Sequence, residues 1–218
     1  MPSCVLPDHV LAALLADDVP HGDLTTEALG IGAQAAELHF RARADLRLCG
    51  VEEAVRLFTL AGCRAQALAA SGDALAAQQP ILHAAGSADA LHRAWKVAQT
   101  LVEWASGLAS AAAALVAAAR PCPVACTRKT PPGSKALAVK AVRAGGAGMH
   151  RLGLSETLLL FAEHRLFLTE APAATIARLQ SSQPERKVVV EVHSVEEGLL
   201  WAQAGAHVLQ LEKFNPDT

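Results

Sequence analysis

The sequence predicts an α/β protein in two parts, an α+β part followed by a parallel sheet that helices cover. Strand-like and helical segments are mixed up to residue 87, whereas beyond Pro121 they alternate regularly as strand, helix, strand. Regular alternation is typical of parallel sheets with covering helices. With 218 residues and 52% hydrophobic content, the chain is large and apolar enough to bury such a core.

The first part begins with a short amphipathic helix, expected over residues 5–15, that ends in the polar loop DDVPHGDLTT. Residues 36–44 alternate apolar and polar side chains, as a half-buried strand does. Residues 51–62 then repeat apolar side chains at helical spacing and stop at a glycine, which predicts a helix. Two more short strands are expected in RAQALAAS and PILHAAG, on either side of the turn SGDAL.

Residues 88–119 form an alanine-rich, nearly proline-free segment that predicts a long helix. We expect an interruption near Ser106 and Gly107, because glycine weakens a helix interior. The predicted domain boundary lies there, which gives an N-terminal domain of residues 1–106 and a second domain of residues 107–218.

Beyond Pro121, four apolar runs predict strands and the segments between them predict helices. The expected strands are residues 123–127, 157–161, 187–192 and 207–211, and the expected helices are SKALAVKAVRAG, PAATIARLQ and SVEEGLLWAQAG. Polar side chains gather at the carboxyl ends of three of these strands: Thr127, Arg128, Lys129, Glu191, Glu212 and Lys213. Ligands of α/β barrels and open sheets bind at this rim.

Composition argues against several classes of protein. The net charge of -2, the pI near 6.5 and the sparse aromatic residues disfavour a nucleic-acid binder.

The N-terminus has no basic leader before its apolar run, so we expect a cytoplasmic protein without a membrane partner. Five scattered cysteines indicate a reducing compartment. Cys122 and Cys126 could form a metal pair, but no second ligand pair lies nearby in the sequence, and we interpret them as ordinary thiols.

The stretch from Cys126 to Glu156 concentrates positive charge in an otherwise slightly acidic chain. Six potential cations are expected to converge on one rim: Arg128, Lys129, Lys135, Lys140, His150 and Arg151. Such a rim can hold a multiply charged anion such as a diphosphate, and Glu191 and Glu212 can then hold ribose hydroxyls or an accompanying metal. The alternative interpretation is that Lys135, Lys140 and Arg143 lie on a solvated helix face.

Seven ordered motifs resemble the quinolinate phosphoribosyltransferase family, also called nicotinate-nucleotide pyrophosphorylase (carboxylating). They are DDVPHGDLTT, ARADLRLCGVEEAVRLF, SGLAS, TRKTPPG, GGAGMHRLGLSE, VEVHSVEE and LQLEKFNP, and they cover essentially the whole chain. The resemblance is strongest to the branch of pyrophosphorylases associated with molybdenum transport.

The resemblance implies an N-terminal open-faced α+β sandwich followed by an α/β barrel, the type II phosphoribosyltransferase fold. It also implies a homodimer in which one subunit helps to close its partner's active site. In the implied reaction, phosphoribosyl pyrophosphate loses diphosphate and a ring nitrogen of a small aromatic acceptor attacks the anomeric carbon, with Mg²⁺ accompanying the donor. The catalytic residues carried over by motif are Lys129, Lys140, Glu191 and Glu212. The substrate-binding residues are Lys96, Arg128, Lys129, Lys135, His150 and Arg151, and Glu191 and Glu212 would also hold the Mg²⁺.

Several positions depart from the family pattern. Trp95-Lys96-Val97 stands where the family has Glu-Arg-Thr, and Phe161 stands where it has a lysine. Lys135 replaces an arginine, and Glu212-Lys213 replaces Asp-Asn. These losses of cations predict an acceptor less acidic than quinolinate. The alternatives are quinolinate turnover in NAD biosynthesis and a non-catalytic nucleotide- or anion-binding protein linked to molybdenum uptake.

The sequence ends in LEKFNPDT, in which Asn215 and Pro216 are typical of a helix start. Only four barrel-type strands precede this point. We therefore expect that the barrel is truncated and that its C-terminal part is missing.

Overall fold

The computed structural model describes residues 3–215 of the chain. It contains two compact units, Met1–His150 and Arg151–Thr218. The helix start expected after Asn215 falls on residues 216–218, outside the described residues.

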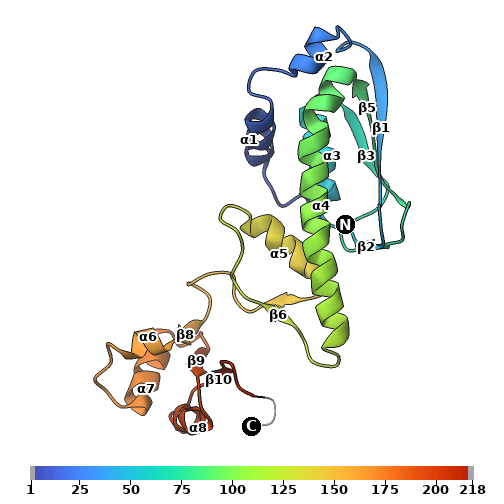
Figure 1. Cartoon of the computed structure of the whole chain (residues 1–218). Coiled ribbons are helices and arrows are strands. Elements are labelled where there is room, and N and C mark those ends of the chain that lie inside the picture. The colour runs from blue at the N-terminus through green and yellow to red at the C-terminus, as the bar shows by residue number, and fades with distance from the viewer. Residues whose placement is uncertain (1–2, 216–218) are drawn as a thin grey trace. The chain divides into compact units, whose positions relative to one another are not determined.

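An antiparallel sheet forms one side of the first unit (Figure 1). Its strand order is β1-β5-β3, and a separate short pair joins β2 to β4. The strands are β1 (Ala35–Arg41), β2 (Leu46–Arg47), β3 (Arg64–Ala67), β4 (Ala74–Leu75) and β5 (Pro80–Ser87). In β1, exposed and half-buried side chains alternate along the whole strand, so one sheet face packs on the core. The strands expected near residues 36–44, in RAQALAAS and in PILHAAG are confirmed.

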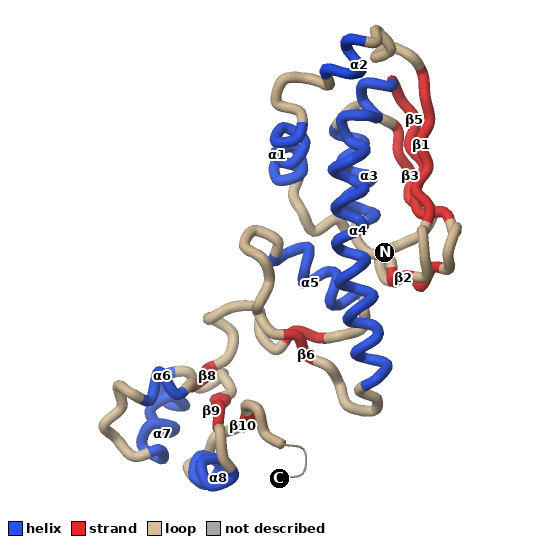
Figure 2. The backbone as a smooth tube through the Cα atoms, viewed as in Figure 1, coloured by secondary structure: helices blue, strands red, loops and turns tan. Residues whose placement is uncertain are grey.

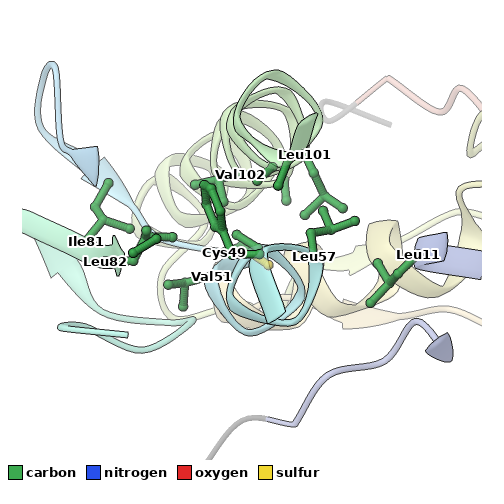
Figure 3. Close-up of a cluster of buried hydrophobic side chains, with 14 of the residues drawn as sticks. Leu11, Cys49, Val51, Leu57, Ile81, Leu82, Leu101 and Val102 are labelled. Carbon is green, nitrogen blue, oxygen red and sulfur yellow. The ribbon is translucent and has the colours of Figure 1, made fainter. Parts of the chain in front are cut away.

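Helices cover the other side of this core (Figure 2). They are α1 (Asp8–Asp18), α2 (Leu24–Ala28), α3 (Val51–Leu60) and α4 (Ala88–Ala118). Leu57 of α3, Leu82 of β5 and Leu101 of α4 belong to one buried cluster (Figure 3). The first helix begins at Asp8, three residues later than expected, because Pro7 occupies its N-cap in an extended conformation.

The predicted interruption of the long helix at Ser106 and Gly107 is wrong, because α4 continues through both residues. The Ser106 side chain does not end the helix but binds the backbone of Cys49. Its hydroxyl accepts a hydrogen bond from the Cys49 amide at 3.0 Å and donates one to the Cys49 carbonyl at 3.2 Å. The buried alanines on either side, Ala105 and Ala109, pack into the core. Packing of this face outweighs the roughly 1 kcal/mol helix penalty of one glycine. The boundary at residues 106 and 107 thus lies within a helix, and as a domain boundary it stays a prediction.

By length and composition alone, α4 could cross a membrane. In the described residues, however, its buried side chains pack against α3 and the antiparallel sheet. That is the arrangement of a core helix.

A strand-helix-strand segment completes the first unit. It consists of β6 (Ala125–Cys126), α5 (Lys135–Ala144) and β7 (Gly148–Met149), and the two strands pair in parallel. The helix α5 packs against α4. A Cβ added at Gly145 would lie 2.5 Å from the Ala109 carbonyl oxygen, so glycine is required where α5 ends against α4.

The second unit is a parallel sheet with helices beside it. Its strands follow the order β10-β9-β8. The elements are β8 (Leu158–Leu160), α6 (Ala162–Arg165), α7 (Pro172–Ser182), β9 (Val188–Val192), α8 (Val195–Gln203) and β10 (Val208–Leu211). Val188, Val190 and Val192 pack with Ile176 of α7 and Trp201 of α8. The four expected strands all occur, but between residues 3 and 215 they belong to two sheets and not to one.

Candidate active site

A cationic edge, which we define as Arg128, Lys129 and His150, follows the paired ends of β6 and β7. Cys126 lies opposite Met149 in the parallel pair, and the His150 amide donates a hydrogen bond to the Cys126 carbonyl at 2.9 Å. The two loops therefore leave the strands side by side. All three side chains are exposed, and none makes a hydrogen bond or ion pair within the described part of the chain. Exposed cations at a strand end, here Arg128 and Lys129, are available to bind an anion, and the His150 ring lies on the neighbouring loop.

Two other predicted cations lie elsewhere in the first unit. Lys135 is the first residue of α5 and is exposed. Lys96 is exposed on α4, where its ammonium lies 5.5 Å from the Trp95 ring centroid and 3.1 Å from the amide oxygen of Gln99. The roles expected for Lys96 and Lys135 stay predictions.

Lys140 is paired with two carboxylates that the sequence analysis did not assign to it. Its ammonium lies 2.7 Å from Oε2 of Glu52 and 2.6 Å from Oε2 of Glu53 on α3. The Lys140 side chain is 8% exposed, so this is not the solvated helix face of the alternative interpretation. Ser71 donates two further hydrogen bonds to Glu52, and the Val5 amide donates one to Glu53. The charge of Lys140 is neutralised inside the first unit, and its predicted catalytic role stays a prediction.

This network changes the pKa of two of its members. Burial acts to raise the pKa of Glu52, but hydrogen bonds from Lys140 and Ser71 outweigh it and lower that pKa below its usual value. Burial likewise acts to lower the pKa of Lys140, and the two glutamates raise it overall. Both Lys140 and Glu52 are therefore charged at neutral pH.

An acidic edge, which we define as Glu191 and Glu212, lies at the carboxyl ends of β9 and β10 in the second unit. Glu191 is opposite Gln210 in the parallel pair, and the side-chain amide nitrogen Nε2 of Gln210 donates a hydrogen bond to Glu191 Oε2 at 2.7 Å. Glu212 comes two residues after Gln210, and its amide donates to the Val192 carbonyl at 3.0 Å. Glu191 and Gln210 therefore lie side by side on one face of the sheet, and Glu212 follows the last residue of β10, Leu211. Carboxylate oxygens are the ligands that Mg²⁺ prefers in proteins.

Arg165 anchors the backbone at Glu191 of the acidic edge, a role that was not expected from the sequence. Its guanidinium donates to the Glu191 carbonyl at 2.8 Å, pairs with Glu197 at 2.7 Å, and lies 5.7 Å from the ring centroid of Trp201. These contacts tie α6 to β9 and α8. The sequence carried no signal for them, because the partners are 26 to 36 residues further along the chain.

Arg151 is buried against the aromatic residue that replaces the family's lysine. Its side chain is in the second unit and is 6% exposed. The guanidinium carbon lies 5.7 Å from the Phe161 ring centroid. The Phe161 ring also stacks on the His164 ring, with the two ring centroids 5.6 Å apart. A guanidinium over an aromatic ring keeps its charge while its flat surface is shielded from water.

The structure thus brings the predicted residues together in two sets. Arg128, Lys129 and His150 share a strand end in the first unit, and Glu191 and Glu212 share one in the second. A set of exposed cations suits a polyanionic ligand, and a pair of carboxylates suits hydroxyl groups or a hard metal ion.

Comparisons with known proteins identify what this chain resembles. Residues 23–106 match the family description "Quinolinate phosphoribosyl transferase, N-terminal domain", and residues 108–218 match its C-terminal domain. The chain is 55% identical over 218 residues to ModD of Rhodobacter capsulatus, provisionally named a pyrophosphorylase, and covers 84% of that protein with 98% of its own length. It is 32% identical over 221 residues to human nicotinate-nucleotide pyrophosphorylase [carboxylating], with 98% of this chain and 74% of that protein covered.

A solved structure shows the same architecture. The crystal structure of NadC from Streptococcus pyogenes matches with a TM-score of 0.88 at 28% identity, covering 99% of this chain and 79% of that one. The α/β fold class predicted from the sequence is confirmed.

Proposed function

The chain belongs to the quinolinate phosphoribosyl transferase family and is a phosphoribosyltransferase, and from this premise we propose that it acts as a ModD-like pyrophosphorylase. It transfers the phosphoribosyl group of phosphoribosyl pyrophosphate to a ring nitrogen of a small aromatic acid-like acceptor and releases diphosphate. The acceptor is less acidic than quinolinate.

The cationic edge is the observation that carries this proposal. Breaking the bond from the anomeric carbon to diphosphate leaves negative charge on the leaving group, and no covalent nucleophile is required. Fixed cations that meet the developing charge lower the barrier and hold the reactants in position. Arg128 and Lys129 supply such cations, with no carboxylate of the described chain neutralising them, and His150 adds an imidazole from the neighbouring loop.

The acidic edge fits the Mg²⁺ that accompanies the donor. Glu191 and Glu212 would hold the ion together with ribose hydroxyls, and hard oxygen ligands at neighbouring strand ends suit it. When bound, Mg²⁺ neutralises part of the diphosphate charge. The contribution of the protein is to keep Glu191 in place through Arg165 and Gln210.

The acceptor end of the site supports a ligand with fewer negative charges than quinolinate. Phe161 offers a ring where the family's lysine would offer an ammonium, and Lys96 is a single cation beside Trp95. Two carboxylates on one acceptor call for paired cations, and an arginine binds a carboxylate in a bidentate manner that lysine cannot. The second candidate is quinolinate turnover, which the 32% identity to human nicotinate-nucleotide pyrophosphorylase favours. A non-catalytic anion-binding role is favoured by the loss of the family's lysine at Phe161, whereas the retained Glu191 and Glu212 favour an enzyme.

We further propose a cytoplasmic homodimer, in line with the soluble metabolic enzymes of the family. The partner subunit would contribute to closing the active site. Sedimentation of the purified chain tests this assembly, since a monomer at micromolar concentration would contradict it.

The proposed reaction is tested by incubating the protein with phosphoribosyl pyrophosphate, Mg²⁺ and a panel of aromatic acids, and following diphosphate release. Release that depends on one acceptor and is lost in Lys129→Ala supports the proposal. Arg143→Ala is the matched control, because Arg143 is an exposed cation on α5 of the same strand-helix-strand segment. Diphosphate release that is equal in all three proteins, or absent with every acceptor, would contradict it.

A further inference from the structure

Two histidines and a glutamate gather on the face of the antiparallel sheet that points away from the core. Glu37 and His39 are two residues apart on β1, so both side chains point to the same face. His39 lies opposite His83 of β5 in the antiparallel register. The neighbours Leu38 and Phe40 pack on the hydrophobic core from the other face. None of the three polar residues belongs to the cationic or the acidic edge.

The ligand atoms of this cluster have nearly the spacing of a metal site. One ligand atom from each residue can be chosen so that all three lie within 4.8 Å of one another. Nε2 of His83 and Oε2 of Glu37 are 3.4 Å apart. Zn²⁺ binds nitrogen and oxygen ligands at about 2.0–2.1 Å in a tetrahedron, which puts two ligand atoms about 3.3–3.4 Å from each other. The first pair is therefore already at the required separation.

His39, the third ligand, would reach the same separation by rotation of its side chain. The rings of His39 and His83 are stacked with centroids 4.6 Å apart and planes at 21°. His39 and Glu37 are exposed, so their side chains can turn toward a shared ion without disturbing the core.

Nε2 of His83, the atom that would bind the metal, lies 3.4 Å from Oε2 of Glu37, the carboxylate that would share the ion. The His83 Nε2 atom is closed off from solvent. A metal bond would satisfy this buried nitrogen, which has no hydrogen-bond partner among the described residues. Imidazole and carboxylate ligands together favour Zn²⁺ and similar transition metals over Mg²⁺ or Ca²⁺.

We propose that Glu37, His39 and His83 form a binding site for one divalent transition-metal ion, with Zn²⁺ as its representative. Three protein ligands leave a fourth position, which water fills. This site is separate from the Mg²⁺ proposed for the acidic edge and differs from it in ligand chemistry.

Calorimetric titration of the full chain with Zn²⁺ tests the proposal. The parent for this test carries Cys4→Ser and Cys122→Ser, which remove the two exposed thiols that would also bind zinc. We expect one zinc ion per chain, and a loss of affinity of about tenfold or more in His39→Ala and in His83→Ala. His9→Ala, which removes an exposed imidazole on α1, is the control and should leave the affinity unchanged.

Glu37→Gln keeps the test decisive if His83→Ala disturbs the sheet. Glu37 is exposed, so this nearly isosteric change should leave the far-ultraviolet circular dichroism spectrum unchanged and still weaken zinc binding. Unchanged zinc affinity in both His39→Ala and Glu37→Gln would overturn the proposal. An equal loss in His9→Ala, or no zinc binding by the parent, would also overturn it.

Discussion

The ammonium nitrogen of Lys140 lies 2.6 Å from Oε2 of Glu53, a carboxylate with no exposed surface. Removing one partner of a buried ion pair leaves the other charge without compensation, which costs about 3–5 kcal/mol. We expect Lys140→Met to lower the free energy of unfolding in urea by an amount of this order. Arg143→Met, three residues further along α5 and exposed, should change it by no more than about 0.5 kcal/mol. Equal stabilities of the two variants would show that the ion pairs of Lys140 do not support the fold.

The same network makes stability depend on pH. The pKa of Glu52 is lowered from 4.5 in the folded state. The stability that Glu52 contributes is therefore present above pH 4.5 and is lost as pH falls through the folded-state pKa. The pKa of Lys140 is raised from 10.5, so its contribution is present below that pH and is lost as pH rises through the folded-state pKa. Unfolding in urea between about pH 3 and pH 6 should show a steeper acid loss in the wild type than in Glu52→Gln. Parallel curves for the two proteins would rule out this source of acid sensitivity.

Two glycines along α4 and α5 should respond to alanine in opposite directions. A Cβ at Gly107 meets no atom within 4 Å and adds a better helix former, so Gly107→Ala should stabilise the protein by about 0.5–1 kcal/mol. A Cβ at Gly145 would lie 2.5 Å from the Ala109 carbonyl oxygen and 2.6 Å from the Ala112 Cβ, so Gly145→Ala should destabilise it by about 1–3 kcal/mol. Thermal unfolding measures both changes. A destabilising Gly107→Ala would argue against the continuous helix.

Quinolinate should be a poor acceptor for the wild-type protein, because Phe161 replaces a cation that the family provides. Phe161→Lys should therefore raise the rate with quinolinate relative to other acceptors. Phe167→Lys is the matched control, because Phe167 is 86% exposed and should leave the preference among acceptors unchanged. Wild-type turnover of quinolinate at a few per second or more, an ordinary enzyme rate, would contradict this prediction.

The order and type of most secondary structure elements could be predicted from the sequence. Alternation in residues 36–44 identifies a strand with one buried face. The continuous apolar run of residues 187–192 identifies a strand that is buried on both faces. The continuity of α4 could not be predicted, because it depends on the lateral hydrogen bonds between Ser106 and Cys49, which are 57 residues apart. Helix propensity alone says nothing of such tertiary contacts.

The candidate site was predicted less completely than the fold. Arg128, Lys129, Glu191 and Glu212 could be singled out because charged residues follow apolar strands. The partners of Lys140 could not, since Glu52 and Glu53 read as ordinary first-turn acids of a helix. Arg165 was missed for the same reason: its role depends on which strand and helix fold back onto it.

The central claim is that the cationic edge binds the phosphoribosyl donor. The most direct measurement is calorimetric titration of phosphoribosyl pyrophosphate with Mg²⁺ into Arg128→Ala and Lys129→Ala, with Arg143→Ala as the control. Each charge-assisted contact contributes about 1.5–3 kcal/mol, so each loss should weaken binding by at least about tenfold, while the exposed positions leave the unfolding curve unchanged. Donor affinity that is unchanged in both folded variants would contradict the account.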